Sequence, residues 1–390
     1  MPHDGPIQLK NGQILGKRWK IIKKIGEGGC GSVYKVEETT TKVEAALKVE
    51  SNYVPGGSVL KLEVSVLRRL YGKPNVCQLL HSGKNNTYSY MVMTLLGESL
   101  NHLFRKCGRE ISVSTQVRLG LNILHGLKQL HDIGYIHRDI KPANFAIGPT
   151  GTQAAHFIHI LDFGLSREFV QRSSDGKMTM RRPRTRCLFR GTTRYCSLNT
   201  HDKGEQSRVD DLWSLLYVMA ELRGTLPWHA SRDKKKVAEM KRSTADKMLL
   251  YNSPVQLLDF AEHLRELNYY TRPNYKKLAD LLNEVMAEGS FKFTDQWDWE
   301  KSSCLRRILN NKEKEKEKEK PQPVSLEEIQ QVKAMQSAEK VEEQNMMQPI
   351  SSQERVDYNP GLTNQLPQAT YNDINNPFPI EDFDTSPLGF

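Results

Sequence analysis

The nine residues HRDIKPANF, which run from His137 to Phe145, gather an aspartate, a lysine and an asparagine around a single proline. An apolar pattern with helical spacing ends just before His137, and a proline cannot continue a helix, so these residues are expected to form a loop. Asp139 can accept a proton, Lys141 can face a negative charge, and Asn144 can offer a hard oxygen to a metal ion. The stretch therefore indicates a loop that carries chemistry.

A second short motif follows the loop. In Ile160-Leu-Asp162-Phe-Gly164 an aspartate comes directly after a short apolar strand. In phosphoryl transfer the attacking hydroxyl loses its proton, negative charge grows on the transferred group, and magnesium bridges the phosphates. The loop and Asp162 together offer a base, a cation and two oxygen ligands for magnesium. The two motifs in this order predict phosphoryl transfer.

A glycine-rich turn lies far upstream of these motifs. The run Gly26-Glu-Gly28-Gly-Cys-Gly31-Ser-Val33 separates two strand-like segments. Glycines there let backbone N–H groups approach phosphate oxygens, and Val33 can cover an adenine face. A strand rather than a helix follows the last glycine, which excludes the dinucleotide-binding fingerprint. Taken alone the motif is weak evidence, because a glycine-rich hairpin is more often just a turn.

A lysine and a glutamate extend the expected nucleotide site. Lys48 ends a buried-looking strand, where an unpaired ammonium would be costly, and Glu63 on the following helix could neutralise it. The pair would then face the α- and β-phosphates of a nucleotide. For each residue alone a plainer interpretation is favoured, a strand-edge lysine and a solvent-facing glutamate. The two downstream motifs favour the functional interpretation.

The composition of the chain excludes several classes of protein. The 390 residues are 38% hydrophobic, which suffices for a core, and no stretch has the roughly 18 unbroken apolar residues of a membrane span. The N-terminus lacks a signal peptide's apolar segment, and the six cysteines contain no Cys-x-x-Cys pair, so we expect a soluble intracellular protein with free thiols. The net charge of +10 fits nucleic acid, an acidic membrane surface, or acidic protein substrates, and does not choose among them.

The chain divides into three parts. Residues 1–18 are expected to be an N-terminal extension, residues 19–300 a folded domain, and residues 301–390 a charged, Gln/Pro/Asn-rich tail that is disordered. Within the domain, strand patterns precede a helix at residues 58–72, and helices dominate after residue 96. The fold class is therefore α+β, with a small β-rich lobe followed by a larger helical lobe.

The ordered set of motifs resembles that of the eukaryotic protein kinases over residues 19–300. The resemblance implies a bilobal fold with ATP and Mg²⁺ between the lobes, Met93 as gatekeeper, and a catalytic Thr192 that bridges Asp139 and Lys141 through its hydroxyl. Asn144 and Asp162 would hold the metal. The implied nucleotide-binding residues are Ile25, Gly26, Glu27, Gly28, Gly29, Cys30, Gly31, Val33, Ala46, Lys48, Glu63, Met93, Thr94, Leu95, Leu96 and Asp162.

Details of the later sequence resemble one branch of this family. The usual Ala-Pro-Glu is replaced by Ser197-Leu-Asn199, which is similar to the casein kinase 1 group, and Trp213 looks most like the tau-tubulin kinases. By that resemblance Arg194 and Arg232 would form an anion site for acidic or phosphorylated substrates. Five further arginines precede this site and are equally open to interpretation as a solvated basic loop: Arg181, Arg182, Arg184, Arg186 and Arg190.

We therefore expect an active serine/threonine kinase, with a pseudokinase scaffold as the alternative and a nucleic-acid-binding protein as a weaker rival. Its partners would be protein substrates, acidic, phosphorylated or cytoskeletal, with no nucleic acid and no membrane. We expect a monomer in the cytoplasm, with the nucleus as a second location. In the tail, Asn376-Pro-Phe378 matches a short docking peptide and Ser386-Pro387 a phosphorylation site, and both matches are weak.

Overall fold

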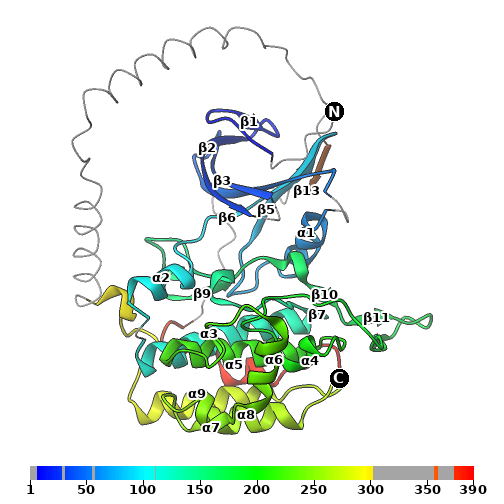
Figure 1. Cartoon of the computed structure of the whole chain (residues 1–390). Helices are drawn as coiled ribbons and strands as arrows, with labels where there is room; N and C mark the ends of the chain where they lie inside the picture. Colours follow the sequence, from blue (N-terminus) through cyan, green and yellow to red (C-terminus); the bar gives the residue numbers. More distant parts are fainter. Residues whose placement is uncertain (1–6, 29–30, 55–57, 110, 302–354, 359–372) are drawn as a thin grey trace, which may run out of the picture.

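An antiparallel sheet forms the N-terminal lobe, which is the upper, blue part of Figure 1. The computed structural model describes residues 7–28, 31–54, 58–109, 111–301, 355–358 and 373–390. The strands lie in the order β1-β2-β3-β4-β6-β5-β13. Their bounds are β1 Ile14–Leu15, β2 Trp19–Gly28, β3 Gly31–Glu38, β4 Glu44–Ser51, β5 Leu79–Lys84, β6 Tyr88–Thr94 and β13 Arg355–Tyr358.

The strand patterns of the sequence explain this sheet. Buried and half-buried residues alternate along β3, because successive side chains of a strand point to opposite faces. Strand β4 is buried from Ala45 to Glu50, since it lies inside the sheet between β3 and β6. Helix α1 (Leu60–Arg69) contacts β5 and β6 and buries Glu63 and Leu67, so Glu63 lies inside the lobe.

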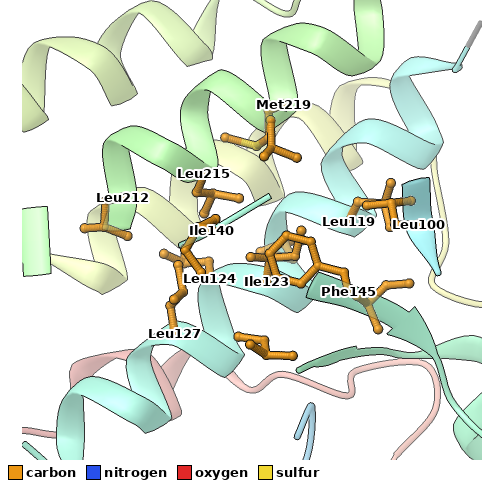
Figure 2. Packing of buried hydrophobic residues seen from close by; sticks show 14 of the residues in the cluster. Leu100, Leu119, Ile123, Leu124, Leu127, Ile140, Phe145, Leu212, Leu215 and Met219 are labelled. Carbon is orange, nitrogen blue, oxygen red and sulfur yellow. The ribbon is translucent and has the colours of Figure 1, made fainter. Parts of the chain in front are cut away.

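Helices build the second lobe. The central helix α3 (Val113–Asp132) is buried along almost its whole length and packs against α5 (Arg208–Arg223) and α9 (Tyr275–Glu288). Figure 2 shows leucines of α3 facing Leu212, Leu215 and Met219 of α5. The remaining helices are α2 Leu100–Lys106, α4 Leu198–His201, α6 Lys234–Ser243, α7 Asp246–Leu249, α8 Gln256–Glu266 and α12 Ile380–Asp384.

Short strands and single turns connect the helices and carry the loops of the site. Pairs β7 with β10, β8 with β9, and β11 with β12 are all antiparallel. Their bounds are β7 Tyr135–Ile136, β8 Phe145–Ile147, β9 Ile158–Ile160, β10 Arg167–Glu168, β11 Val170–Arg172 and β12 Met178–Met180. Four 3₁₀ turns complete the described elements: η1 Pro142–Asn144, η2 Gln153–His156, η3 Phe163–Leu165 and η4 Asp298–Glu300. The two-lobed α+β prediction is confirmed.

The N-terminal boundary differs from the prediction. Leu9 and Leu15, which we assigned to an extension, are buried in the N-lobe cluster with Trp19 and Tyr34. The backbone N–H of Leu9 donates to the Tyr34 hydroxyl at 3.0 Å, and β1 pairs with β2. Residues 7–18 therefore belong to the folded domain, because their few apolar side chains have a sheet edge to cover.

Two described parts of the tail differ from the prediction of disorder: β13, which pairs with β5, and the last eighteen residues. Residues 373–390 pack on the helical lobe, where Phe378 and Phe383 are 3% and 0% exposed. The three phenylalanines of this segment, Phe378, Phe383 and Phe390, were too few to produce a periodic pattern, yet the first two each bury a large apolar area. Phe378 is thus not an exposed docking peptide. Residues 302–354 and 359–372 lie outside the described residues. Among the residues that are described, no helix is long and apolar enough to cross a membrane.

Candidate active site

A cleft of about 470 Å³ separates the two lobes. Every nucleotide-binding residue predicted from the sequence lines it, apart from Gly29 and Cys30, which lie outside the described residues. Those lining it are Ile25, Gly26, Glu27, Gly28, Gly31, Val33, Ala46, Lys48, Glu63, Met93, Thr94, Leu95, Leu96, Asn144 and Asp162. The structure also places there apolar residues to which sequence reasoning gave no part in nucleotide binding, among them Cys77, Ala146 and Leu161.

Three charged side chains meet at the inner end of the cleft. The Lys48 Nζ donates to Glu63 Oε1 at 2.6 Å and lies 3.5 Å from Asp162 Oδ1. Burial raises the pKa of Glu63 to about 7, although Lys48 opposes this. Burial would also raise the pKa of Asp162, but the Lys48 ammonium, a hydrogen bond with Glu63 and the nearby His137 and Lys141 together lower this pKa to about 2. The predicted Lys48–Glu63 pair is therefore present, and Asp162 remains ionised.

Asp162 and Asn144 both line the cleft and both carry oxygen atoms that could bind a metal ion. Asp162 has a left-handed backbone (φ 64°), which a non-glycine residue adopts at a cost, so the surrounding structure imposes this position on the carboxylate. The Asn144 Nδ2 donates to Asp139 O at 2.9 Å, so its carbonyl oxygen is the ligand-capable atom. A carboxylate and an amide oxygen suit Mg²⁺, which usually takes its other ligands from water and phosphates. The described residues contain no group of three or more His, Cys, Asp or Glu side chains that could hold a metal unaided.

The catalytic loop positions Asp139 through both of its carboxylate oxygens. Lys141 Nζ donates to Oδ2 at 2.6 Å, and Thr192 Oγ1 donates to Oδ1 at 2.7 Å. The prediction that the Thr192 hydroxyl bridges Asp139 and Lys141 needs a correction: the Asp139 carboxylate joins the other two. Gly191 makes this approach feasible, because a Cβ there would lie 2.5 Å from Arg138 O and its φ of +111° disfavours other residues.

Comparison with known proteins agrees with this geometry. The sequence model of the protein kinase domain matches residues 19–285. The chain belongs to the protein kinase family. It is 50% identical over 302 residues to a serine/threonine-protein kinase homologue of Caenorhabditis elegans. The alignment covers 77% of this chain and 87% of that protein.

The casein kinase 1 resemblance is confirmed as well. The kinase is 35% identical over 295 residues to casein kinase I homologues of Kluyveromyces lactis and of Saccharomyces cerevisiae. Each alignment covers 74% of this chain and 54% of the relative, so the kinase spans about half the length of these two proteins. The finer likeness to tau-tubulin kinases stays a prediction.

A buried aspartate that sequence reasoning missed holds the catalytic loop of the kinase. Asp211 on α5 accepts the backbone N–H of His137 at 2.7 Å, that of Arg138 at 2.8 Å, and His131 Nε2 at 3.0 Å. Burial opposes ionisation, but these donors lower the pKa of Asp211. They support the left-handed backbone of Arg138 (φ 69°) immediately before Asp139. The only sequence signal was an aspartate within the first turn of a helix.

We expect Asp211→Ala to lower the free energy of unfolding by about 3 kcal/mol, taking ~1 kcal/mol for each of three buried donors left unpaired. Catalysis should fall as well, since the loop loses its anchor. Asp246→Ala is the control, because this carboxylate pairs with the exposed Arg265 and such pairs contribute at most about 1 kcal/mol. Urea unfolding measures both variants. Equal losses of unfolding free energy in the two variants would contradict the role of Asp211 as the anchor of the loop.

The segment before α4 is held by carboxylates in place of the missing Ala-Pro-Glu motif. Glu221 of α5 accepts Arg194 Nη1 at 2.8 Å and the Tyr195 hydroxyl at 2.5 Å. The predicted anion site is therefore divided: Arg194 already pairs with Glu221, whereas Arg232 is exposed. Among the upstream arginines, Arg184 donates twice to the buried Glu205, at 2.5 and 2.9 Å. Arg184 therefore has a structural role and does not fit the interpretation as part of a solvated basic loop.

A basic groove lies beside this segment. It is lined by five lysines and arginines and only two acids, Asp202 and Glu239. Phe189 lies within it, and the Lys234 ammonium is 4.2 Å from the centre of its ring. The basic residues are Arg186, Lys203, Lys234, Lys235 and Arg242. Arg242 is paired with Asp202, so a net positive surface remains for an acidic segment.

Proposed function

We propose that this kinase transfers the γ-phosphoryl group of MgATP to serine and threonine hydroxyls of proteins, with a preference for acidic or phosphorylated target sites. The single observation that carries the transfer is the Asp139 carboxylate, held by Lys141 and Thr192 beside the cleft that contains Lys48, Glu63 and Asp162. A base, a cation and metal-ligating oxygens converge there, as phosphoryl transfer requires.

Each side chain has a definite task in this proposal. The Asp139 carboxylate orients the substrate hydroxyl and accepts its proton, and Lys141, whose Nζ lies 2.6 Å from Asp139 Oδ2, faces the charge that develops on the transferred group. Lys48 binds the α- and β-phosphates while Glu63 holds it in place. The adenine ring is enclosed by Ile25, Val33, Ala46 and, near the end of β6, Met93. This enclosure keeps water from the site.

We propose Mg²⁺ as the metal, held by Asp162 and Asn144. The support is the donor set, one ionised carboxylate and one amide oxygen, which suits a hard cation that also binds phosphates. When bound, the ion would neutralise phosphate charge during transfer. The low pKa of Asp162 keeps this ligand charged throughout the neutral range.

The preference for acidic sites rests on the basic groove and on exposed Arg232. Asp233 follows Arg232 and caps α6, and Lys234 and Lys235 in the first turn of this helix line the groove with Lys203. A phosphoserine or an acidic run in a bound substrate would find several cations within one surface, and charge-assisted hydrogen bonds are about twice as strong as neutral ones.

The test compares two peptides that differ only in a phosphoserine three residues before the target serine. We expect kcat/KM for the phosphorylated peptide to be at least ~10-fold higher with the wild-type kinase, and most of this advantage to be lost in Arg232→Ala, since one charge-assisted bond contributes about 1.5–3 kcal/mol. Lys20→Ala, which removes an equally exposed cation from β2, should keep the advantage.

An equal kcat/KM for both peptides would refute the preference and leave the kinase activity standing. ATP binding without transfer to either peptide would instead favour the scaffold alternative. Arg194→Ala belongs in the series for a different reason, because it removes the 2.8 Å ion pair of the buried Glu221 and leaves the Tyr195 hydroxyl as its remaining close donor. A reduced melting temperature is therefore expected for that variant alone.

Further properties are proposed from resemblance and await tests of their own. By likeness to tau-tubulin kinases, cytoskeletal proteins are candidate substrates, although a shared fold does not transfer a substrate. We propose a cytoplasmic monomer, with the nucleus as a second location, that binds neither nucleic acid nor membrane.

A further inference from the structure

The last eighteen residues form a segment that docks on the helical lobe by two aromatic anchors. In Figure 1 the red C-terminal segment lies against the lower helices. The Phe378 ring lies 4.8 Å from His125 of α3, 6.0 Å from Phe157 and 5.4 Å from Phe293, measured between centroids. Phe383 on α12 also contacts His125, edge-on, with 5.5 Å between the two ring centroids. Residues 373–390 are hereafter the C-terminal segment.

The end of this segment reaches the hairpin formed by β11 and β12. Leu388 and Phe390 pack against a small cluster that includes Val170 of β11 and Met180 of β12. Arg208, at the start of α5, donates to Phe390 O at 2.9 Å and also lies 3.7 Å from the Met180 sulfur. The C-terminal segment therefore contacts the hairpin that precedes Arg194 and Thr192. Arg208, which contacts both Phe390 and Met180, links the position of the segment to that of the hairpin.

A polar contact between the two anchored ends centres on Thr385. Its Oγ1 accepts a hydrogen bond from the buried Lys128 Nζ and donates to Asp382 O at 3.2 Å. Its carbonyl accepts Arg272 Nη2 at 2.7 Å. Thr385 is nevertheless exposed, and so accessible to another kinase, whereas Lys128 is only 2% exposed. The hydroxyl thus lies directly against a buried ammonium.

Carboxylates outnumber the cations around this hydroxyl. The two cations that contact Thr385 are Lys128, through the hydroxyl, and Arg272, through the carbonyl. Lys128 already pairs with Asp132 at 2.6 Å, and Asp382 and Asp384 lie three residues and one residue before Thr385 in the chain. A further dianion would meet at least as much negative as positive charge, and it would have to displace the hydroxyl from the buried ammonium.

We propose that Thr385 is a phosphorylation site whose modification releases the C-terminal segment from the helical lobe. A serine/threonine kinase would supply the group from ATP. A bond forms between Thr385 Oγ1 and the γ-phosphorus, the bond from that phosphorus to the β,γ-bridging oxygen breaks, ADP leaves, and the hydroxyl proton passes to the base of the modifying kinase. Release exposes Phe378 and Phe383 and frees the β11–β12 hairpin from Leu388 and Phe390.

The test is hydrogen–deuterium exchange on the full-length kinase, made by ligation of synthetic C-terminal peptides so that all forms share one junction. We expect slow amide exchange in residues 380–390 of the unmodified protein, and at least ~10-fold faster exchange when residue 385 is phosphothreonine. Exchange in residues 169–180 should also rise. These readouts require no catalytic activity, so they are independent of the substrate preference proposed above.

A phosphoserine at position 386 is the matched control. It adds the same charge one residue further on, where the hydroxyl makes no hydrogen bond within the described part of the chain. We expect exchange within about twofold of the unmodified protein. Equal or slower exchange with phosphothreonine 385 would overturn the proposal, as would fast exchange of residues 380–390 in the unmodified protein or equal release by both phosphorylated forms.

Discussion

Replacing Asp139 with asparagine is expected to lower kcat by about 10³-fold, within the ~10²–10⁴ range for loss of a positioned general base. The amide still fills the space of the carboxylate, and it can still accept a hydrogen bond from Lys141 or Thr192. It cannot accept the proton of a substrate hydroxyl. Initial rates of phosphate transfer from labelled ATP to a peptide measure the loss.

The control for this variant is the nucleotide affinity, because Asp139 lies among the loop contacts and not among the residues that line the cleft. The Kd for ATP and the melting temperature should both stay close to the wild-type values. A kcat within tenfold of wild type would contradict the assignment of the base, whereas loss of ATP binding would show that the loop itself had rearranged.

Replacing Lys48 with methionine is expected to lower kcat/KM for ATP by about 10²–10³-fold, the usual effect of removing one preorganised electrostatic group from an active site. The ammonium lies 2.6 Å from Glu63 and 3.5 Å from Asp162, so its loss removes the cation that, in the proposed mechanism, binds the phosphates and holds Asp162. Steady-state kinetics at varied ATP concentration measure the effect.

The fold should survive this substitution. The pKa of Glu63 is already raised to about 7 by burial, so without Lys48 this carboxyl can take up a proton instead of remaining buried as an unpaired charge. Lys35→Met on the neighbouring strand β3 removes a more exposed pair with Glu44 and serves as the matched control. If both variants retain wild-type kcat/KM, Lys48 does not contact the nucleotide.

The catalytic constellation was readable from the sequence because its parts are short motifs. Asp139, Lys141 and Asn144 lie within one loop, so their spacing alone brings them together, and the structure places Asp162 across the same cleft. The Lys48–Glu63 pair was also predictable, since a buried ammonium requires a buried partner and the next helix offered one. Strand and helix patterns gave the two lobes for the same local reason.

The supports of the site could not be read in this way. Asp211 reaches the backbone of His137 from a helix more than seventy residues later, and Glu221 takes up Arg194, which the sequence assigned to a substrate anion. Which carboxylate meets which donor depends on how the helices pack, and no spacing rule records it. For Arg194 the burial of Glu221 decided the partner.

The sequence by itself determined the protein kinase family and the motifs of the proposed site, because proton transfer, phosphate binding and metal ligation need particular residue types at short separations. Only the tertiary structure decided where the two ends of the chain belong. Leu9, Leu15, Phe378 and Phe383 are isolated apolar residues in polar surroundings, and they fold onto the domain because surfaces made by distant elements leave apolar area for them to cover. Burial of that apolar area supplies the free energy that holds both ends on the domain, although neither end has a periodic pattern in its sequence.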